Sequence, residues 1–217
     1  MREALLLVVF LLTPGATGDD ARTVLDRTKT TAATYASYDW MTGRDEKGIA
    51  NDMWVAEFRE GNRYRAETVD FRAVVNCHTH EGYSLNVRSG ELKRDDTLYD
   101  ECGVSTSGSI ESVVRLPSVT SSAFGMLDVI KVTDATRIRY YQVDRRGVIM
   151  RSNWTARDGS PYPCIQAEPI ARVATLPPGD IFSPKSLTTS VVATQYRRPP
   201  PVFPVTGLSG KRCGENI

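Results

Sequence analysis

The chain has 217 residues, which suits one ordinary domain with short appendages and leaves little room for two full-sized domains. Hydrophobic residues make up 41% and charged residues 24%, so the chain can bury a core and is not globally disordered. Lysine and arginine number 27 against 26 aspartates and glutamates. The net charge of +1 gives no electrostatic reason to expect a nucleic-acid partner or an anionic membrane surface.

Residues 1–18 have the pattern of a secretory signal peptide. Met1-Arg2-Glu3 is weakly charged, Ala4–Leu12 is apolar, and Ala16-Thr17-Gly18 offers the small residues that signal peptidase reads. The apolar run has nine residues, whereas a helix that spans a bilayer needs about 20, which argues against the alternative of an uncleaved anchor. We therefore predict cleavage near Gly18, no later transmembrane segment, and a periplasmic or secreted location.

All four cysteines follow the predicted cleavage site. An even number of cysteines in an exported chain indicates disulfides, because an oxidising compartment favours them. Of the three possible pairings, proximity in sequence favours Cys77–Cys102 and Cys164–Cys213. Each bridge would stabilise the fold by roughly 3–4 kcal/mol in the loop-entropy approximation.

The mature chain begins with a predicted helix and continues with predicted strands. Asp19 and Asp20 suit a helix start. The residues that follow at helical spacing are Val24, Leu25, Thr28, Ala32 and Tyr35. Gly43–Gly48 is polar and predicts a loop. From Met53 the apolar period is two, which predicts an antiparallel meander of four strands over Met53–Arg59, Arg63–Thr68, Phe71–His80 and Tyr83–Val87.

The middle of the chain predicts two helices, and strands resume after them. Ile110, Val113 and Val114 fit a short helix that Pro117 ends, and Ser118 suits the cap of a second helix over Val119–Ile130. The later predicted strands are Ile138–Val143, Val148–Trp154, Tyr162–Gln166, Ile170–Leu176 and Leu187–Tyr196. Pro199, Pro200, Pro201 and Pro204 predict a stiff, extended tail.

This order of elements predicts an α+β fold that is mostly antiparallel β. A broad sheet does not stay flat, and apolar helices need a surface to cover. We therefore predict a strongly curved, half-open β-barrel covered by helices. A single curved-sheet binding domain would occupy residues 19–198, and a proline-rich tail tied by Cys213 would occupy 199–217.

Three segments carry a resemblance to a known family. Met53–Glu67 (MWVAEFREGNRYRAE) follows the N-terminal helix, Ala135–Trp154 forms a late hairpin around Asp144–Gly147, and Pro177–Phe182 is a Pro/Phe segment. In this layout the mature chain resembles the LolA-like superfamily of outer-membrane lipoprotein-sorting carriers. The resemblance implies a concave face that holds the acyl chains of a lipid or lipoprotein, with a helical lid, here Val119–Ile130. This lid would cover a face that carries Trp54, Phe58 and Tyr64. The resemblance also implies an arginine that holds the lid shut, with Arg59 and Arg65 as candidates.

The pattern alone does not say which face of each strand is concave, so the candidate ligand-binding residues are pooled from both faces. They are Trp54, Val55, Phe58, Tyr64, Val75, Leu85, Met126, Leu127, Ile130, Tyr140, Met150 and Trp154. An alternative is that the aromatic residues among them form a closed core, as buried aromatics usually do.

The strongest local cluster of reactive residues is Cys77-His78-Thr79-His80. On a strand, His78 and His80 would share one face, as two metal ligands must, but a closed zinc site needs four ligands. Adjacent residues of a strand point to opposite faces, which argues against a cysteine hydrolase built from Cys77 and His78. A surface histidine pair and a pH-sensitive contact are further alternatives.

The sequence contains none of the common hydrolase, zinc-protease or nucleotide-binding motifs. We therefore predict an exported, non-enzymatic carrier or binding protein for lipid, lipoprotein acyl chains or another apolar ligand, without a cofactor. One alternative is an interaction or sensing module of the cell envelope on the same scaffold, with a protein partner. A metal-binding protein or hydrolase at Cys77–His80 is the third.

Overall fold

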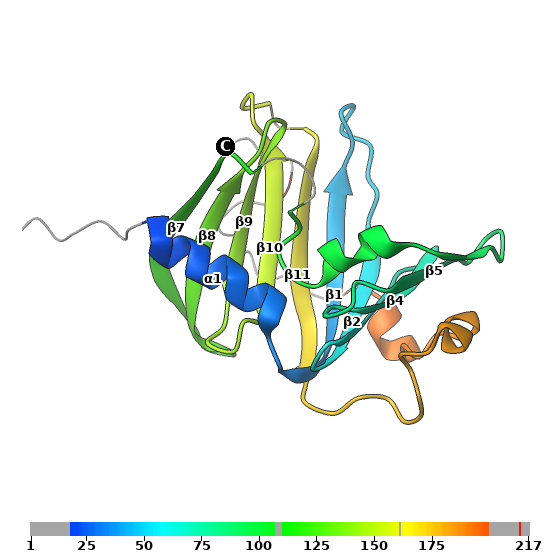
Figure 1. Ribbon diagram of the computed structural model, residues 1–217. Coiled ribbons are helices and arrows are strands. Elements are labelled where there is room, and N and C mark those ends of the chain that lie inside the picture. The colour runs from blue at the N-terminus through cyan, green and yellow to red at the C-terminus, as the bar shows by residue number, and fades with distance from the viewer. Residues whose placement is uncertain (1–17, 107–109, 161, 200–212, 214–217) are drawn as a thin grey trace, which may run out of the picture.

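The computed structural model describes residues 18–106, 110–160, 162–199 and 213 (Figure 1). Residues 1–17 of the predicted signal peptide, and all but the first residue of the proline run, therefore lie outside the described residues. One α-helix, α1 (Gly18–Thr30), precedes the strands. The strands are β1 (Thr34–Arg44), β2 (Met53–Glu60), β3 (Arg63–Glu67), β4 (Phe71–Asn76), β5 (Gly82–Asn86), β6 (Leu92–Arg94), β7 (Ser112–Ser121), β8 (Gly125–Thr133), β9 (Arg137–Val143), β10 (Ile149–Ala156) and β11 (Cys164–Val173). Three 3₁₀ helices are η1 (Asp96–Glu101), η2 (Pro184–Thr188) and η3 (Thr194–Arg197).

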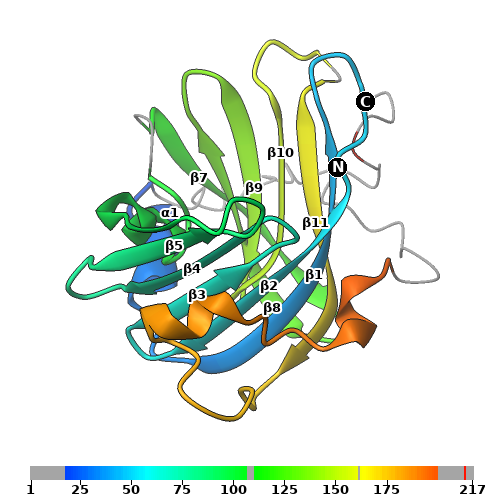
Figure 2. The same cartoon turned by 90° about the vertical axis from the view of Figure 1, so that its right-hand side faces the viewer.

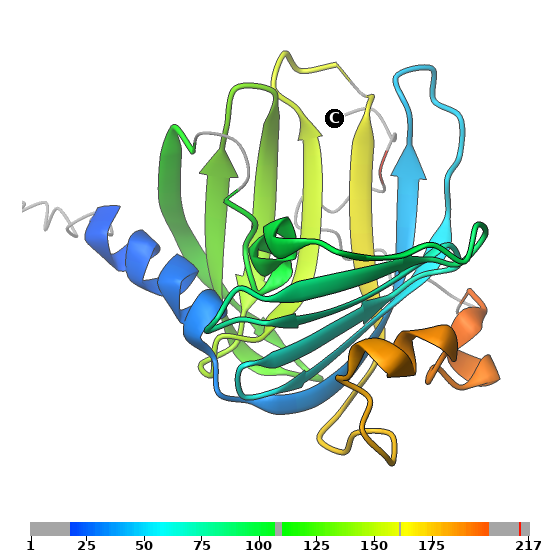
Figure 3. The same ribbon diagram turned by 45° about the vertical axis from the view of Figure 1, so that its right-hand side comes forward.

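All eleven strands form one antiparallel sheet in the order β6-β5-β4-β3-β2-β1-β11-β10-β9-β8-β7. Consecutive strands pair within β1–β6 and within β7–β11, and pairing of β1 with β11 joins these two halves of the chain. The two halves turn toward each other around β1 and β11 (Figure 3). Strands β6 and β7 are the two edges of the sheet, each paired on one side only. The predicted strongly curved, half-open barrel is confirmed.

Helix α1 lies across the concave face of β7–β10 (Figure 1). Ala21, Val24, Leu25 and Thr28 are buried at the i, i+3, i+4, i+7 spacing of an amphipathic helix. Val24 and Leu25 pack with Ile130 of β8 and with other buried residues of β8, β9 and the loop after η1. On the other half of the sheet, Leu98 of η1 and Cys102 pack on the face of β3 and β4.

The convex face of β1–β4 is covered by the segment that follows β11. Figure 2 shows η2 and η3 on the outer side of these strands. Ile181 and Val192 of this segment join a buried cluster with Tyr38, Trp54 and Phe58 of β1 and β2. The ring of Tyr196 stacks on Tyr38 with centroids 3.8 Å apart.

Arg65 fastens this C-terminal segment to the sheet. Its guanidinium is fully buried and donates to the carbonyl oxygens of Ile181 (2.7 Å) and Thr189 (2.9 Å) and to the Ser186 hydroxyl (2.7 Å). Glu67, also fully buried, neutralises it at 2.6 Å. A buried ion pair of this kind requires both partners, because either one alone leaves an uncompensated charge.

The two predicted helices between residues 110 and 130 are wrong, because this region forms the β7–β8 hairpin. Four of the ten residues of β7 and four of the nine residues of β8 are β-branched and favour the extended backbone, although the apolar spacing also fits a helix. Gly125, at φ +73°, supplies the turn. Pro117 lies at a register irregularity of the edge strand, a position where proline is tolerated.

Three other boundaries differ from the sequence prediction. Helix α1 ends at Thr30 within a threonine-rich run, and Tyr35 belongs to β1, a strand that the helical spacing concealed. The two strands predicted over 162–176 are parts of one strand, β11. The strand predicted over Leu187–Tyr196 is wrong, because β1 and β2 are already paired on both edges and the segment packs across their convex face instead.

Both predicted disulfides are confirmed. Cys77 bonds to Cys102 and Cys164 to Cys213, with Cα atoms 5.7 Å apart in each. The first joins the β4–β5 turn to the end of η1. The second joins the start of β11 to Cys213.

We expect Arg65→Ala to destabilise the protein by about 3–5 kcal/mol, because it leaves Glu67 charged and buried. Urea unfolding would measure the loss, and limited proteolysis would detect cleavage within residues 176–197. Arg88→Ala is the control, because Arg88 is 78% exposed in its surface pair with Asp70 and should cost less than about 1 kcal/mol. Equal effects of the two substitutions would contradict the anchoring role of Arg65.

Candidate functional site

The candidate site is the concave face of the central strands, where the side chains are less buried than those on the convex face of the same strands. On β2 the convex-facing residues Trp54, Ala56 and Phe58 are buried, whereas the concave-facing Met53, Val55 and Glu57 are only half-buried. On β11, Ile165 and Ala167 are half-buried in the same way. The core therefore lies outside this part of the sheet, and solvent reaches apolar side chains inside it.

These side chains form continuous cross-strand rows. Opposite residues of an antiparallel pair project to the same face. One row runs through Met53, Met41, Ala167, Ser152 and Tyr141 on β2, β1, β11, β10 and β9. The next row contains Ile165 and Trp154, with the Arg137 guanidinium 5.9 Å from the Trp154 ring centroid. Together they present an apolar strip about five strands wide.

Arg59 ties α1 and η1 together over the other end of this face. Its side chain is buried and donates to the carbonyl oxygens of Lys29 at the end of α1 (2.9 Å) and of Cys102 after η1 (3.0 Å). A third bond goes to the carbonyl oxygen of Gly61 (3.0 Å). The Lys29 ammonium lies 3.6 Å from the Asp100 carboxylate and so adds a second link between α1 and η1.

A polar row lies between the arginine and the apolar strip. Glu57, Ser37 and Arg172 are cross-strand neighbours on β2, β1 and β11. The Arg172 guanidinium pairs with Asp39 at 2.8 Å, and Asp39 also accepts a hydrogen bond from Ser37 (2.7 Å). Burial raises the pKa of Glu57 to about 7; the Asp39 charge adds to the rise, and Arg172 opposes it.

The structure divides the candidate residues into groups. Val55, Tyr64, Val75, Ile130 and Trp154 lie on the concave face; Tyr64, Val75 and Ile130 are buried against η1 or α1. The residues on the convex face are Trp54, Phe58, Leu85 and Tyr140. Leu127 and Met150 are buried in a cluster with Tyr35, whereas Met126 is 56% exposed.

Two corrections follow for the expected lid. Because Val119–Ile130 is a hairpin, it is not a helical cover over Trp54, Phe58 and Tyr64. Those three residues do not share a face either, because Phe58 is opposite Arg65 and Tyr64 is opposite Arg59. The same register separates the two candidate arginines: Arg59 contacts α1 and η1, and Arg65 contacts the C-terminal segment.

Five residues of the concave face were not predicted from the sequence: Met41, Met53, Glu57, Tyr141 and Ile165. Their signal was the alternation itself, because each is two residues from another concave-facing position. Assigning the face required knowing that β1 exists and that β11 is its partner, and helical spacing had concealed β1.

A second opening lies at one rim of the sheet. Tyr35, Phe124, Val148, Met150 and Arg172 are among the residues that line a cleft of about 360 Å³ there. It reaches the Tyr35 cluster from the side of the β7–β8 turn. Arg172 therefore borders both this cleft and the polar row.

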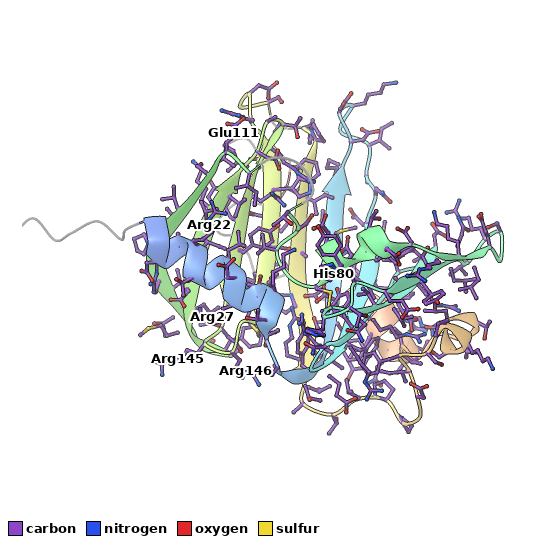
Figure 4. The ribbon with its side chains drawn as sticks, in the orientation of Figure 1. Arg22, Arg27, His80, Glu111, Arg145 and Arg146 are labelled. Atoms are coloured by element: carbon purple, nitrogen blue, oxygen red, sulfur yellow. A yellow bond between two sulfur atoms is a disulfide. The ribbon has the colours of Figure 1, made fainter. Side chains whose placement is uncertain are left out.

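The Cys77–His80 segment is a turn and not the strand on which the two histidines were expected to share a face. The Cys77 thiol is consumed in its disulfide. The His80 ring stacks on Tyr99 of η1, with centroids 4.4 Å apart (Figure 4). Within the described ranges, no group of three His, Cys, Asp or Glu side chains is placed to hold a metal ion.

No helix among the described residues is both long and apolar enough to cross a bilayer. No protein-family profile matches the sequence, and no curated protein matches it.

The solved structures that are similar to the chain include the following three. One is described as an outer-membrane lipoprotein-sorting protein domain from Vibrio parahaemolyticus, with 8% identity and a TM-score of 0.44 over 80% of this chain and 100% of that one. Another is a LolA superfamily protein from Nitrosomonas europaea, with 6% identity and a TM-score of 0.41 over 75% and 97% of the two chains. A DUF1329 family protein from Desulfovibrio piger has 8% identity and a TM-score of 0.40 over 78% and 97%. Two of the three thus bear the names that the sequence layout suggested.

Arg59→Leu should loosen the contact between α1 and η1, because three carbonyl oxygens lose their donor. We expect amide hydrogen exchange to accelerate in residues 98–104 by about tenfold, as a loss of about 1.4 kcal/mol of local stability would give. Arg22→Leu, an exposed change on α1 (Figure 4), is the control and should leave this exchange unchanged. Unchanged exchange in both variants would contradict the role of Arg59.

Glu57 should make stability fall as pH rises. Its pKa is about 7 in the folded protein against an ordinary 4.5, so between these values only the unfolded chain ionises and unfolding becomes easier. The contribution of Glu57 to stability is fully present below pH 4.5, is lost as pH rises from 4.5 through about 7, and amounts to about 3 kcal/mol. Urea unfolding at pH 5 and pH 8 should show a smaller difference for Glu57→Gln than for the wild type. The same difference in both proteins would contradict the assigned pKa.

Proposed function

We propose that the protein is an exported, non-enzymatic carrier that binds a lipid, lipoprotein acyl chain or other apolar ligand on the concave face of its sheet. The observation that carries the proposal is the half-burial of Met53, Val55, Ile165 and Ala167 on strands whose convex side buries Trp54, Ala56 and Phe58. In a strongly curved sheet, the most deeply buried side chains normally lie on the concave face. Here the apolar strip is left for another molecule to cover.

The energetics of an acyl chain fit a partly covered strip. Burying a methylene group stabilises by roughly 0.8 kcal/mol, so a 16-carbon chain offers an upper bound of roughly 12 kcal/mol. A site that captured all of it would not release its ligand. A cover that competes for the same surface lowers the net affinity. In this protein η1 and the end of α1, held by Arg59, take the role that the sequence analysis gave to Val119–Ile130.

The two disulfides support an extracytoplasmic location, because such bridges form and persist in oxidising compartments. A periplasmic or secreted carrier is consistent with the signal-peptide pattern of residues 1–18. Because Cys77 is bonded to Cys102, its thiol is available neither as the nucleophile of a hydrolase nor as a metal ligand.

An envelope interaction or sensing module is the second candidate. The β7–β8 hairpin at the edge of the sheet exposes Val114 (45%), Val119 (37%) and Met126 (56%). A protein partner that pairs with the unpaired edge of β7 would cover apolar side chains there. This role and the carrier role use different surfaces of the molecule.

Val55→Asp should abolish binding of a hydrophobic fluorescent dye and of lipid detected by native mass spectrometry, because it places a charge in the apolar strip. Val114→Asp is the matched control on the convex face of β7 and should leave both signals intact. Circular dichroism would establish that each variant is folded. Lipid retained by Val55→Asp and lost by Val114→Asp would favour the hairpin over the concave face.

A further inference from the structure

Glu57 places a carboxyl group beside the apolar strip of the proposed binding face. It lies on β2 two residues from Val55 and four from Met53, on the same concave face, and its side chain is half-buried. Within the part of the chain that the structure describes, no ion pair joins it, and its side-chain hydrogen bond comes from the Tyr64 hydroxyl.

The groups around Glu57 leave a surplus of negative charge. Arg172 of β11 is engaged by Asp39 of β1, and the Arg59 guanidinium donates to three carbonyl oxygens. Glu101 of η1 contributes another carboxyl; the nearby Lys29 ammonium is shared with Asp100, from which it lies 3.6 Å. Tyr35 and Tyr64 are neutral because burial raises their pKa values. With the Lys29–Asp100 pair included, four carboxyls face three cations, an excess of one negative charge.

The order of polar and apolar side chains along the concave face suits a ligand that has a polar head and an apolar chain. Along β2, the buried arginine is followed by the carboxyl and then by the apolar strip, over about 20 Å of strand. A ligand with a polar head and an apolar chain would lay its chain on the strip and bring its head to the carboxyl. An anionic head would meet repulsion there, whereas an ammonium head would complete the missing ion pair.

We infer that Glu57 is the head-group contact of the concave face and that the site selects amphiphiles with an ammonium head over those with a carboxylate head. The inference rests on the proposed carrier function, which it deepens by naming the ligand class. Ligand binding is then linked to proton release, because an adjacent cation favours the ionised form of Glu57. Affinity for the cationic ligand rises with pH, and affinity for an anionic ligand falls.

The test is calorimetric titration of the full mature chain with dodecylammonium and with dodecanoate, both below their micelle concentrations, at pH 6 and pH 8. We expect dodecylammonium to bind more tightly than dodecanoate at pH 8. Its affinity should rise about tenfold between pH 6 and pH 8, as the ionised fraction of a group with a pKa near 7 does. The wild-type comparison requires no variant to fold.

Glu57→Gln should remove both the head-group preference and the pH dependence while the chain still binds. Glu60→Gln, on the same strand and paired with Arg63 outside the face, is the matched control and should keep both. Equal affinity of the two ligands at both pH values, or a preference that persists in Glu57→Gln, would overturn the inference and leave the carrier function standing. If neither ligand binds the wild type, the carrier function fails and the inference fails with it.

Discussion

The β2–β3 hairpin places one buried arginine on each face of the sheet, and the coverings of both faces depend on this pair. Arg59 is opposite Tyr64 and Phe58 is opposite Arg65, so the register of the hairpin sends the two guanidiniums in opposite directions. Arg59 binds the ends of α1 and η1, and Arg65 binds the segment after β11. Each arginine satisfies backbone carbonyls that no strand or regular helix pairs, which is why irregular chain can be packed on a sheet without burying unmet acceptors.

This division explains why the concave face remains partly open. The aromatic residues that would fill a closed barrel, Tyr38, Trp54 and Phe58, are used on the convex side under the C-terminal segment. Inside, the strip combines Tyr141 and Trp154 with smaller or flexible side chains, including two methionines, Met41 and Met53, that adapt to ligands of irregular shape. Polar residues line one end of the same face, so the site is amphipathic as well as concave.

Much of the sheet was predictable because a period of two is a strong local signal. The hairpins of β2 to β5 and of β9 and β10, the disulfides and the curved form all followed from alternation, turn residues and cysteine proximity. The β7–β8 region was not predictable, because its apolar residues fit both periods, and only pairing with β9 and packing under α1 decide between them. The concave face was likewise beyond local reasoning, because a strand pattern identifies two faces but not which one a distant helix will cover.

The disulfide between Cys164 and Cys213 attaches the C-terminal segment of the convex face to the sheet a second time. This segment follows β11, and Cys213 beyond it is bonded to Cys164 at the start of the same strand. If its contacts with Tyr38 and Arg65 break, the freed chain remains within a closed ring of the polypeptide. The second attachment keeps the freed chain closer to its site than a tail held at one end, so it rebinds at a higher effective concentration.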